Sequence, residues 1–240
     1  MPKEKPELSD AMRKKLSGSS REKKPINGTK FTIAISSAKG GVGKSTFATN
    51  LALALKQNGC KVGLLDADIY GPSIPKMFGI NEKPKSDGQK LEPVIKYDIQ
   101  CMSIGFLTDE KTPMIWRGPM VTSAIKTFTQ QVNWKDLDFI IVDMPPGTGD
   151  AQLTFSQGIE MNGAIIVSTP QEVALLDVKR GIKMFDKLNV KVLGLIDNMS
   201  FFVGDDGKKY NIFGEGGVKR TAEEFNNCLL YTSPSPRDTR

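Results

Sequence analysis

Short apolar runs separated by amphipathic stretches of helical length constrain the fold of this 240-residue chain more than any other feature. A nearly continuous apolar run is typical of a strand buried on both faces, and such strands form parallel sheets whose connections are helices. The sequence therefore predicts an α/β fold, with a doubly wound, mainly parallel sheet and helices on both faces. The predicted strands are 31–37, 61–66, 99–104, 139–143, 164–168 and 190–197, and the predicted helices are 45–57, 119–132, 151–159 and 170–188.

The helix predicted over 170–188 also carries a start signal. Thr169 is placed as its N-cap, Pro170 falls in its first turn, and Glu172 completes a capping box. A further helix is predicted to begin near Gly217.

Composition divides the chain into three parts. Residues 1–30 are rich in Pro, Ser, Lys and Glu, which predicts a flexible basic arm, and their acidic residues argue against a mitochondrial transit peptide. Residues 31–227 form the predicted domain. Residues 228–240 resemble a translated sequencing adapter, so we expect a non-native tail after a truncated domain; an ordinary polar tail is the alternative.

The net charge of +6 is confined to the ends of the chain. Residues 1–30 hold 9 basic and 4 acidic residues, and residues 228–240 hold 2 and 1. Residues 31–227 are left with 33 − 9 − 2 = 22 basic and 27 − 4 − 1 = 22 acidic residues. A balanced domain gives no indication of a nucleic-acid-binding face.

The chain lacks histidine, the commonest general base, so catalysis would rest on carboxylates, lysines, hydroxyls and backbone dipoles. Its three cysteines, Cys60, Cys101 and Cys228, form no CxxC pair and indicate neither a disulfide framework nor a zinc site. No apolar run approaches the roughly 20 residues of a membrane span, and no signal peptide is visible. A cytoplasmic protein is the expectation.

A glycine-rich loop between the first predicted strand and helix indicates a phosphate site. Its backbone N–H groups and the helix N-terminus would face one point, where phosphate oxygens bind. Lys44 would neutralise the β- and γ-phosphates, the Ser45 hydroxyl would ligate Mg²⁺, and Thr46 would bind the α-phosphate. Ala38 stands where the usual pattern has its first glycine. The predicted ATP-binding run is Lys39, Gly40, Gly41, Val42, Gly43, Lys44, Ser45 and Thr46.

Carboxylates follow two other predicted strands, and the carboxyl ends of parallel strands collect at one edge of a sheet. Asp143 is a Walker B type acid that would hold Mg²⁺ through water, and Gly147 could offer its N–H to the γ-phosphate. Asp66 is assigned to the metal shell, and Asp68 to the orientation of the attacking water. Ordinary strand-end or turn roles are the alternatives for these carboxylates.

The additional lysine of this loop, Lys39, resembles the signature lysine of the deviant Walker A ATPases, which include division-site and plasmid-partition proteins. In that group the lysine reaches the partner's phosphates across a nucleotide-sandwich dimer, so the resemblance implies a homodimer. It also implies that Lys39, Lys44 and Asp68 are the catalytic residues.

Three further motifs are similar to those of the Mrp/ApbC/Nbp35 family of iron–sulfur cluster carriers. They are the run 66–75, Trp116-Arg117-Gly118-Pro119-Met120 and Asp197-Asn198-Met199-Ser200. The resemblance covers residues 31–227 and implies a slow, Mg²⁺-dependent ATPase that assembles or transfers clusters to apoproteins. It also implies that Asn198 contacts the adenine. A partition or positioning ATPase that binds membrane or DNA is the alternative.

The chain departs from this family after Asn198. Many members carry a CxxC pair there, whose thiolates hold a cluster across the dimer. Gly204 and Gly207 occupy those positions here, so no iron–sulfur ligand is identified. Cys60 and Cys101 fall on predicted core elements and are interpreted as structural thiols.

Overall fold

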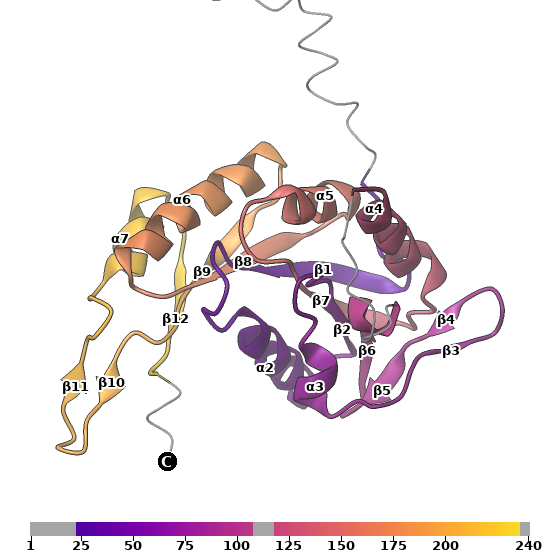
Figure 1. Ribbon diagram of the computed structural model, residues 1–240, viewed down its shortest axis with the longest axis horizontal. Coiled ribbons are helices and arrows are strands. Elements are labelled where there is room, and N and C mark those ends of the chain that lie inside the picture. The colour runs from indigo at the N-terminus through magenta and orange to yellow at the C-terminus, as the bar shows by residue number, and fades with distance from the viewer. Residues whose placement is uncertain (1–22, 108–117, 236–240) are drawn as a thin grey trace, which may run out of the picture.

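The computed structural model describes residues 23–107 and 118–235 of the chain, and its centre is an eight-stranded sheet (Figure 1). Every neighbouring pair of strands in this sheet is parallel except β5 and β6, which are antiparallel. The predicted mainly parallel sheet is therefore confirmed. The strands follow the order β12 (Leu229–Thr232), β9 (Val192–Asp197), β8 (Gly163–Ser168), β1 (Thr29–Ser36), β7 (Leu137–Asp143), β2 (Val62–Asp66), β6 (Ile99–Ser103) and β5 (Val94–Lys96).

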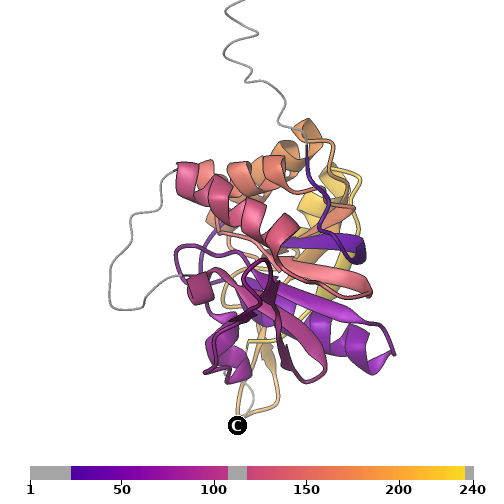
Figure 2. The same ribbon diagram turned by 90° about the vertical axis from the view of Figure 1, so that its right-hand side faces the viewer.

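Helices cover both faces of the sheet, as Figures 1 and 2 show. One face carries α2 (Lys44–Gln57) and α3 (Ile74–Phe78). The opposite face carries α4 (Gly118–Lys126), α5 (Asp150–Gly158), α6 (Glu172–Lys187) and α7 (Gly217–Glu224). Two short helical turns complete the set, η1 (Ile104–Leu107) and η2 (Thr127–Gln131).

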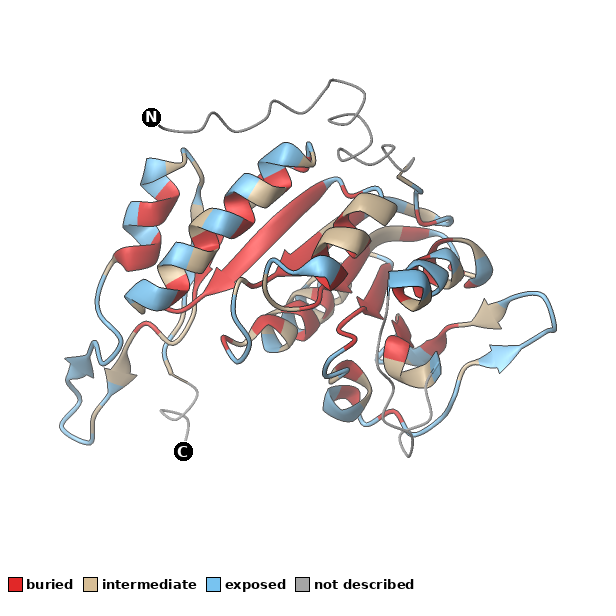
Figure 3. Ribbon diagram, turned by 45° about the horizontal axis from the view of Figure 1, so that its top comes forward, coloured by how far each residue is buried: buried red, intermediate tan, exposed pale blue. Residues whose placement is uncertain are grey.

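Each face of the sheet has its own hydrophobic core. Along β1, Ala34 belongs to the core under α4 to α7 and the next residue, Ile35, to the core under α2 and α3; both are fully buried. Successive side chains of a strand point to opposite faces, so a strand covered on both sides has to be apolar at every position. Figure 3 shows this as a central band of buried strands.

Two small hairpins lie outside the main sheet and were not predicted. One pairs β3 (Lys85–Ser86) with β4 (Leu91–Glu92), and the other pairs β10 (Phe202–Val203) with β11 (Lys209–Tyr210). Both project from the body of the molecule (Figure 1), and their strands are half-buried or exposed (Figure 3). Strands of two residues carry too little apolar pattern to be recognised in a sequence.

The start predicted for α6 is wrong. The helix begins at Glu172 with Gln171 as its N-cap, and no side chain caps it. Thr169 is followed by proline, which disfavours helical geometry at the preceding residue, and Gln171 keeps an extended ψ of 132°. The predicted helix 119–132 is likewise divided, because it changes at Thr127 into the π-helical turn η2.

The folded region differs from the predicted range 31–227 at both ends. Lys24 exchanges backbone hydrogen bonds with residues 158 and 160, and Ile26 is buried, so the last part of the predicted arm packs on the domain. At the other end Leu229–Thr232, which we expected to contribute nothing to the fold, forms the edge strand β12 beside β9. The division into arm, domain and tail remains a prediction.

Candidate functional site

The glycine-rich loop joins β1 to α2, as predicted, and its backbone requires glycine. Gly41 and Gly43 have φ angles of +79° and +89°, a region that other residues rarely adopt. A Cβ atom on Gly43 would lie 2.2 Å from Nδ2 of Asn198, so a side chain has no room there. The loop leads directly into Lys44, the first residue of α2, whose free N–H groups favour an anion.

Lys44 turns inward and forms the centre of the site. Its Nζ lies 2.7 Å from Oδ1 of Asp143, 3.3 Å from Oδ2 of Asp68 and 3.4 Å from Oγ of Ser45. The Lys44 side chain is only 6% exposed, so these charges interact where water screens them little. Four residues that the sequence assigned to phosphate and metal chemistry therefore meet at one point.

Asp66 and Asp143 end adjacent strands and are register partners in the pairing of β2 with β7. Both are fully buried. Burial raises the pKa of Asp66 to about 7, with a further contribution from the negative charge of Asp143. Burial also raises the pKa of Asp143, while Lys44 opposes that shift.

The donors around Asp143 fit a magnesium ion. Oδ2 of Asp143 is buried and accepts no hydrogen bond from the described residues, and the Ser45 hydroxyl lies beside the same lysine. Hard oxygen ligands of this kind suit Mg²⁺, which keeps several waters. Asp66 differs, because its oxygens accept hydrogen bonds from the N–H groups of Asp68 and Ile74 and from the Ser103 hydroxyl.

Two predicted nucleotide contacts are occupied by protein groups in this structure. The Gly147 N–H, assigned to the γ-phosphate, donates to the carbonyl of Ser37 at 2.8 Å. The Asn198 amide, assigned to adenine, donates to the carbonyl of Val42 at 2.8 Å. A γ-phosphate contact by Gly147 would require its internal bond to open, because a backbone N–H is a single donor, whereas the Asn198 amide keeps a second N–H.

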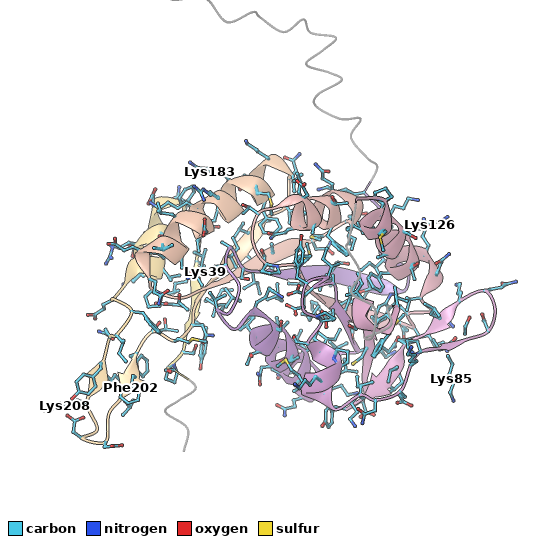
Figure 4. The ribbon with its side chains drawn as sticks, viewed as in Figure 1. Lys39, Lys85, Lys126, Lys183, Phe202 and Lys208 are labelled. Carbon is cyan, nitrogen blue, oxygen red and sulfur yellow. The ribbon has the colours of Figure 1, made fainter. Side chains whose placement is uncertain are left out.

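Lys39 in the loop and Thr46 in the first turn of α2 are both exposed. Figure 4 shows Lys39 on the segment between β1 and α2. Within the ranges 23–107 and 118–235, Lys39 forms no ion pair, unlike the buried Lys44. Trp116 and Arg117 of the second family motif lie outside the described residues.

Sequence reasoning missed two polar residues beside this site. Ser103 ends β6 and donates to Asp66 at 3.3 Å, and the rule that identified the strand-end aspartates could have identified it too. Gln152 lies on α5, is 1% exposed and bonds to Ser36 at the end of β1. A polar residue on the apolar face of a predicted helix was the available signal.

The β10–β11 hairpin is built without the cysteine pair of the resembling family. Tyr210 donates its hydroxyl proton to Oδ2 of Asp206 at 2.8 Å. A Cβ atom on Gly204 would lie 2.7 Å from Cε2 of Tyr210, so the ring occupies the space that a cysteine would need. Cys101 lies on β6 and Cys228 precedes β12, near opposite edges of the sheet, and burial raises the pKa of Cys101 to about 12.

Known proteins similar to most of this chain carry names that agree with one another. The iron-sulfur cluster carrier protein of Synechocystis is 51% identical over 220 residues, which are 89% of this chain and 62% of the relative. The iron-sulfur cluster transfer protein NUBPL of Mus musculus is 51% identical over 89% of this chain and 68% of its own length. The chain thus spans about two thirds of these relatives or less.

A solved structure and a family model agree with these relatives. The nucleotide-binding protein of Archaeoglobus fulgidus in complex with ADP superposes with a TM-score of 0.75 at 39% identity, covering 88% of this chain and 83% of that one. The ParA family model described as the NUBPL iron-transfer P-loop NTPase matches residues 28–239. From the loop geometry, the fold and these matches together, we conclude that this chain belongs to the NUBPL iron-transfer P-loop NTPase family.

Proposed function

We propose that this protein is a Mg²⁺-dependent, ATP-hydrolysing homodimeric switch that carries iron–sulfur clusters to apoproteins. The observation that carries the ATPase part is the buried group in which Lys44 meets Asp143 at 2.7 Å and Asp68 at 3.3 Å. The cluster-carrier part is supported by relatives at 51% identity that are named as cluster carrier or transfer proteins. The cytoplasmic location expected from the sequence stays a prediction; no helix in the described ranges is long and apolar enough to span a membrane.

The proposed division of labour follows from the contacts. Lys44 would leave the carboxylates to neutralise phosphate oxygens, and Lys39 would do so from the partner chain. Asp143 and Ser45 would hold the magnesium ion, whose charge stabilises the transferring phosphoryl group. Asp66, whose oxygens already accept internal hydrogen bonds, would act on the metal through water.

Asp68 is proposed to orient the attacking water. One of its oxygens accepts the Tyr70 N–H at 3.1 Å, which fixes the carboxylate, and the other faces Lys44. Once Lys44 moves to a phosphate, this second oxygen becomes free to accept a hydrogen bond from the water. Turnover is expected to be slow, as suits a regulatory switch.

The nucleotide part is tested by calorimetric binding of ADP and by phosphate release from ATP, for wild type, Lys44→Ala and Asp68→Ala. Lys44→Ala should weaken ADP binding and abolish release, whereas Asp68→Ala should bind ADP and lose release. Two variants with unchanged rates would contradict the assignment. Co-sedimentation with DNA or anionic vesicles in the presence of ATP provides the test of a partition or positioning role.

The cluster part is tested separately by anaerobic reconstitution with ferrous iron and sulfide. The expected results are bound iron and faster cluster transfer to an apo-ferredoxin. Absence of both would refute the carrier role while leaving the ATPase assignment intact.

A further inference from the structure

A buried polar pair lies between α5 and the end of β1. Gln152 is 1% exposed and Ser36 is 2% exposed, and Nε2 of Gln152 donates to Oγ of Ser36 at 2.5 Å. Ser156 lies one turn further along the same face of α5 and is fully buried. The surrounding face is otherwise apolar, as the fully buried Phe155 illustrates.

This pair is costly for packing alone. Oε1 of Gln152 is buried and has no hydrogen-bond partner among the described residues. A buried polar atom without a partner costs about 1–3 kcal/mol, and apolar residues of the same shape would avoid that cost. The polar pair therefore points to a role beyond holding α5 against the sheet.

The pair connects the two segments that are proposed to contact the phosphates. Ser36 is the last residue of β1, and the glycine-rich loop follows it. Gln152 lies in the first turn of α5, which begins directly after the segment 144–149 that follows β7. A second tie joins the same two segments, because the Gly147 N–H donates to the Ser37 carbonyl at 2.8 Å.

A movement of α5 relative to the end of β1 would also affect α4. A Cβ atom on Gly158, at the end of α5, would lie 3.0 Å from the side chain of Ile125 on α4, so the two helices are in close contact. Packed interfaces shift between discrete arrangements rather than deform gradually. A change in the position of α5 would therefore be passed to α4.

We propose that Gln152 is a positioning residue that links the phosphate loop to α5 through Ser36, so that the nucleotide state sets the position of α5 and α4. This inference rests on the proposed nucleotide function. The spare acceptor, Oε1, lets the amide exchange partners as the loop moves, which an apolar side chain cannot do.

The test compares Gln152→Leu, Ser36→Ala and the double variant in the full chain, with Ser156→Ala as the matched control. Each single variant of the pair leaves a polar partner unsatisfied and should lower the urea midpoint, and the double variant should recover it. Phosphate release under single-turnover conditions should fall about tenfold in Gln152→Leu and in the double variant, with ADP affinity within about twofold of wild type. Ser156→Ala should keep the wild-type rate.

Hydrogen exchange distinguishes positioning from packing, because a purely structural Gln152 would leave the effect of ADP on amide exchange unchanged. ADP should change the exchange of α4 and α5 amides in wild type and Ser156→Ala, but not in Gln152→Leu or the double variant. If the double variant recovers its rate together with its stability, the pair is only structural and the inference is overturned. If wild type binds no ADP, the proposed function itself fails, which is a different result.

Discussion

Lys44 and Asp143 form a buried ion pair across the phosphate site, with Nζ and Oδ1 2.7 Å apart and the side chains 6% and 0% exposed. The lysine that is proposed to bind phosphate therefore also neutralises carboxylates of the protein itself. Its charge contributes to the stability of the nucleotide-free protein as well as to the proposed chemistry.

Replacing Lys44 with Met should destabilise the nucleotide-free protein by about 3–5 kcal/mol, because the carboxylate of Asp143 is left buried without its partner. Urea unfolding in the absence of nucleotide and magnesium measures this loss. Lys30→Met is the control, since Lys30 pairs with Asp138 at the surface at a similar 2.8 Å and should change the unfolding free energy little. Equal effects of the two substitutions would contradict the argument.

Asp66 should give the protein an unusual pH dependence. Its pKa is raised by burial to about 7 in the folded state, above the unfolded value of 3.8, so the folded state binds the proton more tightly. Its stabilising contribution is therefore complete below pH 3.8 and is lost as pH rises through about 7. The unfolding free energy should fall by about 2 kcal/mol between pH 5 and 7.

This pH window is favourable because the chain has no histidine to titrate in it. Urea unfolding of wild type and Asp66→Asn at pH 5 to 8, with a chelator present, isolates the contribution. The variant should show a shallower slope, since only Asp143 and Asp197 then remain among the described acids whose pKa is raised. Parallel slopes would show that Asp66 does not titrate there.

Gly43→Ala should weaken nucleotide binding in addition to lowering the stability of the protein. The substitution forces alanine into a φ of +89° and places its Cβ 2.2 Å from Nδ2 of Asn198. Gly59→Ala is the matched control, because Gly59 has a similar φ of +85° but open space around it. Both should lose about 1–2 kcal/mol of stability from the left-handed backbone.

Only Gly43→Ala should also raise the Kd for ADP, by tenfold or more, since it displaces the loop and Asn198 together. Calorimetry on both variants measures this difference. An unchanged Kd for Gly43→Ala would show that the approach to Asn198 has no part in binding.

The hairpin should not accept iron through cysteines alone. In Gly204→Cys/Gly207→Cys the first Cβ would lie 2.7 Å from the Tyr210 ring, so we expect no gain of bound iron after anaerobic reconstitution. Adding Tyr210→Ala should open the space and allow thiolate ligation. Iron and sulfide are measured in the variants with and without Tyr210→Ala. Iron uptake by Gly204→Cys/Gly207→Cys without the Tyr210 substitution would refute the steric argument.

Much of the main sheet could be predicted because its strands are buried on both faces. Ala34 and Ile35 point into different cores, so the run has to be apolar at successive positions, and that pattern is visible in the sequence. The two hairpins could not be found this way, because their two-residue strands are half-buried or exposed. The edge strand β12 was missed for another reason, because residues 228–240 were interpreted as a non-native tail. Likewise α6 has Gln171 rather than Thr169 at its N-cap position, since Pro170 disfavours helical geometry at Thr169.

The part of the candidate site that could be predicted is the part at the ends of parallel strands, because their carboxyl ends lie at one edge of the sheet. That rule placed Asp66 and Asp143 together, and they are register partners. It could not show that Lys44 would bond to Asp143, or that Gly147 and Asn198 would bond to loop carbonyls, because these contacts join residues about 100 or more positions apart or depend on one backbone conformation.

The approach of Gly204 to the ring of Tyr210 makes these two positions epistatic. A thiol at 204 meets the ring, and loss of the ring first removes the hydrogen bond to Asp206 that closes the hairpin. Each first step therefore carries its own cost, a steric contact at position 204 or a lost hydrogen bond at position 210. The effect of a thiol at position 204 therefore depends on the residue at position 210, and a mutational route to a thiolate-bearing hairpin depends on the order of the two changes.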